Sequence, residues 1–265
     1  MVASHTFPLV AVDIGNSRIK FGLFQQAADT KDCLPAPDFS WELEPDPGRM
    51  TEIAARLSDA HCTPEAVSWW VGSVQRSVTV QLVDWLRSRD VSRITLLTAG
   101  DLPLGVRVPR PDMVGIDRLL GAVAANRLRT EGSPAVVVDL GTAITVDLVS
   151  PAGEFLGGAI LPGIGMSARA LHEFTDLLPL LEMKSLAEPP AALGANTIDA
   201  MRSGIYWGAV GGARQLIELL SSSVQGNMEI YLTGGAAPAV AGLLAPSAVY
   251  VPHLTLAGIA LAAAQ

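Results

Sequence analysis

Two short acidic turns in the sequence carry the residue types that bind phosphate. The first lies in Asp13-Ile-Gly-Asn-Ser17 and the second in Asp139-Leu-Gly-Thr142, and each directly follows an apolar run. Glycine lets a ligand approach the backbone closely, while backbone amides and hydroxyl groups can donate to phosphate oxygens. The carboxylate can hold a cation. The repeated pattern therefore predicts that phosphate groups are held between two similar halves of the chain.

A third candidate lies between these turns, where Gly115-Ile-Asp-Arg118 precedes an apolar helical pattern. Arg118 offers a planar fork for a carboxylate, and Asp117 could accept a proton from a substrate. The alternative is structural, because aspartate at a helix N-cap accepts backbone N–H groups. Both interpretations of Asp117 remain open from the sequence.

Other polar residues allow two interpretations each. Arg18 and Lys20 could reach a polyphosphate or form only the solvated face of a strand. Thr233-Gly-Gly235 follows a predicted strand, and its glycines could let an adenine lie on the backbone. His172, near the end of a predicted helix, is interpreted as structural.

The spacing of apolar residues predicts alternating strands and helices, which indicates an α/β architecture. Strands are expected at residues 9–14, 17–24, 39–43, 67–71, 94–98, 136–149 (two strands joined by the second acidic turn), 154–161, 229–232 and 248–251. Helices are expected at 49–60, 78–89, 118–129, 166–173, 197–222, after the glycine pair at 234–235, and at 254–264. The repeated acidic hairpin divides the chain into domains 1–130 and 131–265.

The longest predicted helix carries features of its own. Asn196 or Thr197 is placed to cap its N-terminus. Glycines recur along it at positions 204, 208, 211 and 212. Small residues permit close helix packing, so we expect a homodimer interface on this helix.

Composition narrows the classes of function. The chain has 265 residues, a net charge of −8 and 49% hydrophobic residues, so it can bury a large core. The acidic charge and the lack of a basic stretch argue against nucleic acid as a partner. No apolar run is long enough to span a bilayer, and neither cysteine fits a metal or disulfide spacing. These observations predict a cytoplasmic protein without a membrane partner.

Taken together, the motifs resemble those of the type III pantothenate kinases, within the acetate/sugar kinase, Hsp70 and actin superfamily. Six motifs carry the resemblance, and they occur in order between about residues 9 and 261: Asp13-Ile-Gly-Asn-Ser17, Gly115-Ile-Asp-Arg118, Asp139-Leu-Gly-Thr-Ala143, Gly157-Gly-Ala-Ile-Leu-Pro-Gly163, Gly194-Ala-Asn-Thr197 and Thr233-Gly-Gly235. The resemblance implies two duplicated ribonuclease-H-like (actin-like ATPase) domains with a nucleotide cleft between them. It also implies a homodimer and phosphorylation of pantothenate by ATP, the first step of coenzyme A synthesis.

The resemblance assigns roles to individual residues. It places ATP on Asp13, Ile14, Gly15, Asn16, Ser17, Arg18, Ile19, Lys20, Thr142, Thr233, Gly234 and Gly235. It places pantothenate on Gly115, Ile116, Asp117, Arg118 and Thr197, with Asp117 as the proton acceptor. It also implies Mg²⁺ with the nucleotide, and K⁺ or NH₄⁺ at Asp139.

The chain departs from the family pattern before Gly115. Many members have a Tyr and an Asn-Pro pair there, where this chain has Val108, Arg110 and Pro111. The role of this loop is therefore left open.

Two rival functions are a superfamily kinase acting on a sugar or an acetate-like acid, and a non-enzymatic regulator. The Gly115–Arg118 motif favours an anionic acceptor over a sugar, and the three aspartates favour catalysis over binding alone.

Overall fold

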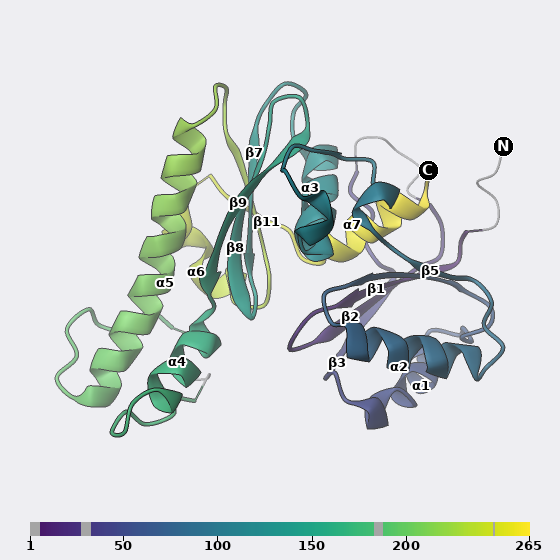
Figure 1. Cartoon of the computed structure of the whole chain (residues 1–265), viewed down its shortest axis with the longest axis horizontal. Coiled ribbons are helices and arrows are strands. Elements are labelled where there is room, and N and C mark those ends of the chain that lie inside the picture. Colours follow the sequence, from purple (N-terminus) through teal and green to yellow (C-terminus); the bar gives the residue numbers. More distant parts are fainter. Residues whose placement is uncertain (1–5, 28–32, 183–187, 246) are drawn as a thin grey trace. The chain divides into compact units, whose positions relative to one another are not determined.

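Two compact units make up the chain. The computed structural model describes residues 6–27, 33–182, 188–245 and 247–265 (Figure 1). Unit 1 comprises Met1–Leu128 and His253–Gln265, and unit 2 comprises Arg129–Pro252. Both units are mixtures of strands and helices, as the alternating patterns predict.

Unit 1 is built on a mixed sheet with the order β3-β2-β1-β4-β5. The strands of this sheet are β1 (Leu9–Ile14), β2 (Ile19–Phe24), β3 (Phe39–Leu43), β4 (Ser68–Ser73) and β5 (Ile94–Leu96). The short strand β6 (Gly105–Val106) is not part of it. The helices of unit 1 are α1 (Glu52–Asp59), α2 (Arg76–Arg87), α3 (Ile116–Leu128) and α7 (Leu254–Ala263), and single 3-10 turns lie at Pro47–Arg49, Ala99–Asp101 and Pro111–Met113. All five main strands were predicted to within a few residues.

The two faces of the unit 1 sheet are covered by different helices. Alternate residues of β1, such as Val10 and Val12, pack in one apolar cluster with α1 and α2. The intervening residues face α3 and α7 (Figure 1). Asp13 belongs to this second set, because side chains alternate along a strand.

Helix α7 is apolar on all sides. Nine of its residues are buried, including Leu256 and Ile259, and a helix of this kind must be enclosed. It packs on the sheet of unit 1 and against α3, where a side chain at Gly258 would collide with the backbone of Leu120. The division at residue 130 assigned this helix to the second domain. The structure places it in unit 1 instead, because the α3-covered sheet offers the apolar surface that encloses it.

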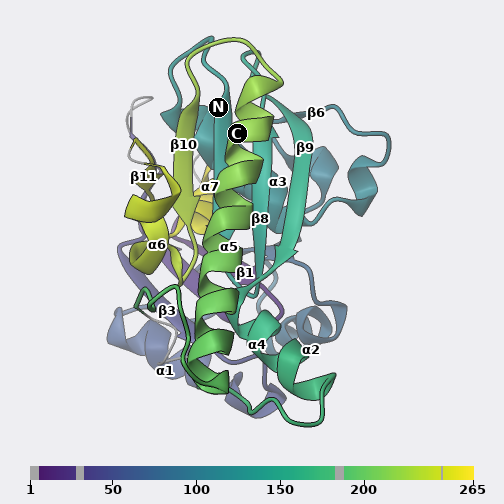
Figure 2. The same cartoon turned by 90° about the vertical axis from the view of Figure 1, so that its left-hand side faces the viewer.

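Unit 2 has its own mixed sheet, in which the strands of the unit follow the order β11-β10-β7-β8-β9. These strands are β7 (Ala135–Leu140), β8 (Ala143–Val149), β9 (Glu154–Pro162), β10 (Glu229–Thr233) and β11 (Val249–Tyr250). The helices are α4 (Ile164–Glu173), α5 (Thr197–Ser222) and α6 (Ala237–Leu244). Figure 2 shows the long α5 lying over one face of the sheet, where it packs on β7, β8 and β9.

The two sheets have the same topology. In each, a central strand (β1 or β7) pairs antiparallel with the next strand and parallel with a later one (β4 or β10). The hydrogen bonds at the first residue of β4 and of β10 also correspond: Ser68 N–H donates to Pro8 O, and Glu229 N–H donates to Pro134 O. This correspondence supports the duplication inferred from the acidic hairpins.

Candidate functional site

The acidic turn of unit 1 joins β1 to β2. Gly15 N–H donates to Arg18 O at 3.0 Å, which closes the turn. Asp13 is 8% exposed and lies opposite Lys20 in the β1–β2 ladder. Asn16, Ser17 and Arg18 are exposed at the tip. The turn therefore presents side chains and backbone to a ligand while its carboxylate is held inside.

The start of α3 lies next to this turn. Asp13 is in register with Gly72 of β4, and a side chain at Gly72 would meet Ile116 and Leu120 of α3. After β4, Val74 N–H donates to Ile14 O. The structure thus brings the first phosphate-type turn and the Gly115–Arg118 motif, which are about 100 residues apart, to the same edge of unit 1.

Asp117 sits in the first turn of α3. The helix begins at Ile116, one residue earlier, so Asp117 does not occupy the N-cap position that the structural interpretation gave it. Its Oδ1 accepts a hydrogen bond of 2.9 Å from Arg118 N–H. A Cβ at Gly115 would lie only 2.5 Å from the same oxygen, so glycine is required for this carboxylate position.

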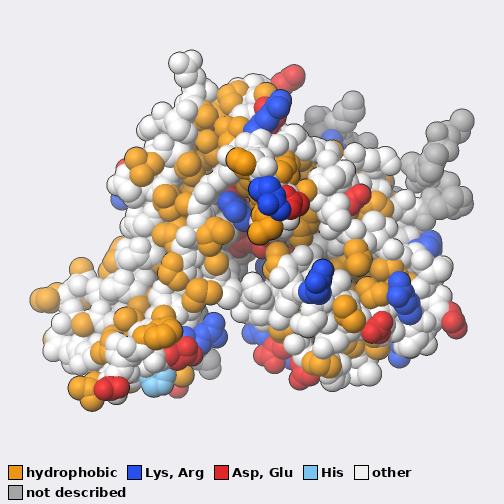
Figure 3. Space-filling view, in the orientation of Figure 1, with side chains coloured by type: hydrophobic (Ala, Val, Ile, Leu, Met, Phe, Trp, Pro, Cys, Tyr) orange, Lys and Arg blue, Asp and Glu red, His pale blue; other side chains and the backbone are white. Residues whose placement is uncertain are grey.

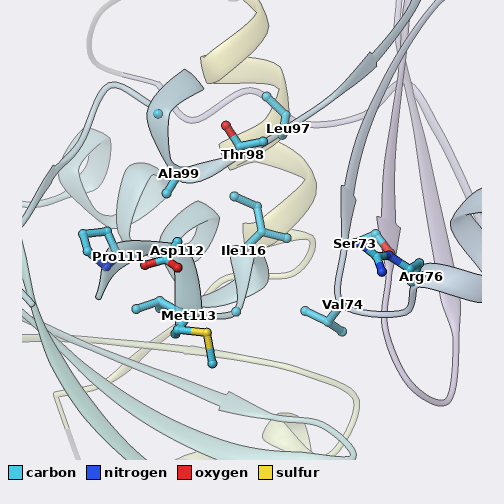
Figure 4. Close-up of a pocket in the computed structure, with 13 residues that line it drawn as sticks. Ser73, Val74, Arg76, Leu97, Thr98, Ala99, Pro111, Asp112, Met113 and Ile116 are labelled. Carbon is cyan, nitrogen blue, oxygen red and sulfur yellow. The ribbon is translucent and has the colours of Figure 1, made fainter. Parts of the chain in front are cut away.

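A cavity of about 890 Å³ opens beside the motif (Figure 4). Its wall consists of Ser73, Val74, Arg76, Leu97, Thr98, Ala99, Gly100, Pro111, Asp112, Met113, Val114, Gly115 and Ile116. Gly115 and Ile116, which were predicted to contact substrate, are part of this wall, whereas Asp117 and Arg118 are not. In Figure 4, Arg76 and Ser73 lie across the view from Pro111, Asp112 and Met113, with Ile116 and Val74 between the two groups.

Much of this wall was not predicted from the sequence. Residues after β4 and around Thr98 come from loops whose local patterns indicate only turns. What could have indicated a site is their position in the chain: both loops follow the ends of the parallel strands β4 and β5, where α/β proteins commonly bind ligands.

The departure from the family pattern has a structural outcome. Arg110 donates to both oxygens of Asp112, with Nε–Oδ1 at 2.9 Å and Nη2–Oδ2 at 2.6 Å. This hydrogen bonding holds the pKa of Asp112 below its ordinary value and raises that of Arg110. The loop thus contributes an internal ion pair to the rim of the cavity.

Arg18 is also held by a carboxylate. Its Nη1 lies 3.0 Å from Glu44 Oε1, and both side chains are more than half exposed. Exposed pairs of this kind contribute little to stability, so a stronger anion can displace Glu44. Lys20 lies further inside and is partly buried.

The acidic turn of unit 2 is tighter and more enclosed. Only Gly141 and Thr142 separate β7 from β8, and Gly163 N–H donates to Thr142 O at 3.1 Å. Gly234 adopts φ +94°, and a side chain there would collide with Asp139 Oδ1 and with the backbone of Leu140. The predicted cation ligand therefore lies against the predicted adenosine turn, as the pairing of Asp139 with Thr233 requires.

The remaining predicted residues of unit 2 lie on separate elements. Thr197 is the exposed first residue of α5, and Asn196 is its cap, accepting from Asp199 N–H at 2.9 Å. His172 contacts Leu178 O through Nδ1 at 2.8 Å, which fits its structural interpretation.

The described part of the chain contains no cluster of three or more metal-ligating His, Cys, Asp or Glu side chains. None of the described helices has the length and apolarity needed to cross a bilayer.

Solved structures show a similar fold at low sequence identity. The ethanolamine utilization protein EutJ from Carboxydothermus hydrogenoformans matches with a TM-score of 0.52 and 12% identity, over 95% of this chain and 88% of that one. A ROK family glucokinase from Streptomyces griseus matches with a TM-score of 0.51 and 13% identity, over 95% and 97%. This likeness supports the actin-like fold with two ribonuclease-H-like domains.

Sequence comparisons identify the family. The model of type III pantothenate kinase matches residues 9–219. The type III pantothenate kinase of Dehalococcoides mccartyi (strain CBDB1) is 33% identical over 269 residues, covering 96% of this chain and 94% of that protein. Those of Gluconobacter oxydans and Koribacter versatilis are 40% and 43% identical, but the match spans only 64% and 47% of their lengths. The chain belongs to the type III pantothenate kinase family.

Proposed function

We propose that this protein transfers the terminal phosphoryl group of ATP to the primary hydroxyl group of pantothenate, the first step of coenzyme A synthesis. One observation carries the proposal: the Asp13 turn and the Gly115–Arg118 motif meet at one edge of unit 1, next to a cavity. Phosphoryl transfer needs a phosphate-binding turn beside an acceptor site, because positioning and charge neutralisation supply most of the catalysis.

The cavity suits the chemistry of the acceptor. Pantothenate has a branched apolar centre between a hydroxyl end and a carboxylate end. Val74, Met113 and Ile116 provide apolar wall, and both Val74 and Met113 are exposed to the space they line. A neutral sugar would gain little from such a surface, so the wall favours pantothenate over the sugar alternative.

Asp117 is proposed to orient the substrate hydroxyl and accept its proton. Arg118, the next residue, is proposed to bind the acceptor with Gly115, Ile116 and Thr197. Asp117 has a supporting backbone hydrogen bond from Arg118 N–H, which leaves a second carboxylate oxygen for the substrate. General base catalysis of this kind contributes about 10²–10⁴-fold.

ATP is proposed to contact the segment Asp13–Lys20, Thr142 and the turn Thr233–Gly235. Arg18 and Lys20 supply positive charge beside the first turn, and Gly235 of the third segment leaves the backbone open, since an added Cβ there meets nothing. Mg²⁺ accompanies the nucleotide and neutralises phosphate charge. Asp139 is proposed to bind K⁺ or NH₄⁺, since its carboxylate lies beside backbone groups of Leu140 and Gly234. A cytoplasmic location fits the use of ATP.

The proposed reaction is tested by coupling ADP release to pantothenate, with and without K⁺. Turnover with pantothenate, and none with glucose or acetate, is the expected result, while turnover with glucose or acetate alone would overturn the assignment. Asp117→Asn should lower kcat about 10²–10⁴-fold and leave ATP binding unchanged. Asp59→Asn, at the exposed end of α1, is the matched control. A near-normal kcat in Asp117→Asn would reduce that residue to a helix-stabilising role.

A homodimer through α5 is the proposed assembly. Gly204, Gly208 and Gly211 share an exposed face of this helix, and an added Cβ at each meets nothing. Phe174, Leu177 and Leu193 nearby are at least 85% exposed. Figure 3 shows apolar side chains gathered over the end of unit 2 formed by α4 and the loop after it. A surface of this kind commonly marks an interface.

Light scattering of Gly208→Arg tests the assembly. A single chain accommodates the new side chain, so the expected result is a folded monomer where the wild type is a dimer. Asp84→Arg, on the exposed side of α2, is the control and should remain dimeric. A Gly208→Arg protein that is still dimeric would place the interface elsewhere.

A further inference from the structure

The cavity of unit 1 has four polar side chains in its wall, and three of them are already occupied. Ser73 Oγ accepts from Thr79 Oγ1 at 2.6 Å and from Gln75 N–H at 3.0 Å. Thr98 Oγ1 donates to Asp101 Oδ2 at 2.6 Å. Asp112 is held by Arg110 through two hydrogen bonds.

Arg76 is the fourth polar side chain. Its guanidinium makes no hydrogen bond or ion pair with any residue that the structure describes. It is exposed, and it lies across the cavity from Asp112 (Figure 4). Because Asp112 is neutralised by Arg110, Arg76 is the uncompensated charge of the cavity wall.

The position of Arg76 is not explained by helix stability. It is the first residue of α2, and a cation in the first turn opposes the helix dipole. The N-cap residue before it, Gln75, makes no side-chain capping hydrogen bond. A cation kept at this place, and pointing its charge to an open cavity, suits an anionic ligand.

We propose that Arg76 is a specificity-determining residue that binds the carboxylate of the acceptor. The guanidinium fork matches a carboxylate in two parallel hydrogen bonds. This inference rests on the proposed function, and it adds a residue outside the motifs that assigned the site. It also assigns a consequence to the altered loop: because Arg110 is paired with Asp112, the cation that the cavity wall offers to the acceptor is Arg76, at the start of α2.

The test uses three variants of the full-length protein. Arg76→Gln removes the charge at similar length, and Arg76→Lys keeps the charge without the fork. Arg87→Gln is the matched control, because Arg87 is exposed at the other end of α2 and outside the cavity. Steady-state kinetics are measured with pantothenate and with a neutral analogue in which an amide replaces the carboxylate.

The expected result is a selective loss of acceptor recognition. Arg76→Gln should raise the KM for pantothenate roughly tenfold, as for loss of a charged hydrogen bond. Its kcat and its KM for ATP should stay near the wild-type values. The KM of Arg76→Lys for pantothenate should lie between those of Arg76→Gln and the wild type, and the KM of Arg87→Gln should match the wild type. The preference for the acid over the amide should shrink in Arg76→Gln.

Two other outcomes separate the inference from the function on which it rests. Wild-type turnover of pantothenate with an unchanged KM in Arg76→Gln overturns the role of Arg76 alone. Equal rises of KM for the acid and the amide do the same, since they indicate a distorted cavity and not a lost carboxylate contact. A wild-type protein without pantothenate turnover overturns the proposed function and this inference together.

Discussion

The two acidic turns begin from the same sequence pattern and the same place in the same sheet topology, yet their surroundings differ. The turn of unit 1 has four residues between its strands, Gly15–Arg18. Its exposed tip includes Arg18, and Lys20 follows in β2. The turn of unit 2 has two residues, no following cation, and glycines at 163 and 234 packed against it. The two copies of the hairpin are therefore packed differently, which agrees with the proposal that the first contacts phosphate and that Asp139 of the second binds a cation.

Among the changes that compare the two turns, the largest effect should come from replacing Asp13 and Asp139 one at a time. Asp13→Asn and Asp139→Asn should each lower kcat/KM about 100-fold, which corresponds to about 2.7 kcal/mol. Only Asp139→Asn should abolish the response of activity to K⁺, because only that carboxylate is proposed to bind the ion. Titration of K⁺ at fixed ATP measures the difference. An equal K⁺ response in both variants would remove the distinction between the turns.

Glycine substitutions should separate the turns by stability. Gly234→Ala forces a side chain into positive φ and into Asp139, so we expect a loss of about 1–3 kcal/mol in the free energy of unfolding. Gly15→Ala meets only Arg18 O, at 3.3 Å, and should cost less than about 1 kcal/mol. Urea unfolding of both variants provides the comparison. Equal losses would mean that the two turns are equally constrained.

The cations of unit 1 should affect nucleotide binding. Lys20→Met should raise the KM for ATP about tenfold, as for one lost charged contact. Glu44→Gln should lower that KM slightly, since it releases Arg18 from its ion pair. Steady-state kinetics at fixed pantothenate measure both. A Lys20→Met enzyme with normal KM for ATP would assign Lys20 to the solvated face of β2.

The smallest expected effect concerns the residues that begin the corresponding strands β10 and β4. Glu229 accepts from Thr130 N–H at 2.9 Å and from Tyr231 Oη–H at 2.6 Å, whereas its counterpart in unit 1 is Ser68. Burial raises the pKa of Glu229, but these hydrogen bonds outweigh it and bring the pKa below the ordinary value of 4.5. Burial of Tyr231, and after it the hydrogen bond to Glu229, raise the pKa of the Tyr231 phenol.

A carboxyl group whose pKa is lower in the folded than in the unfolded protein stabilises the fold at pH values above its unfolded pKa. This stabilisation is lost as the pH falls through the folded pKa. Glu229→Gln should therefore cost about 1 kcal/mol at pH 7, and the gap to the wild type should narrow below about pH 4.5. Ser68→Ala should show no such pH dependence. Urea unfolding at pH 7 and pH 4 measures both variants, and a constant gap for Glu229→Gln would contradict the pKa argument.

The sequence alone determined the elements, the duplication and the family. Apolar periodicity placed nearly every strand and helix, because burial of one face imposes a period on local sequence. The Asp-X-Gly pattern located both hairpins, and Asn196 located the start of α5. Motif order then led to the type III pantothenate kinases, which the comparisons confirmed.

Only the tertiary structure decided which distant pieces meet. Helix α7 is apolar on every side, so no periodicity in it indicates which sheet it covers, and it packs in unit 1. The ion pair of Arg110 with Asp112, and the place of Arg76 in the wall of the same cavity, depend on loops brought together by parallel strands. Local sequence records how a segment is buried, but its partners are selected by long-range packing.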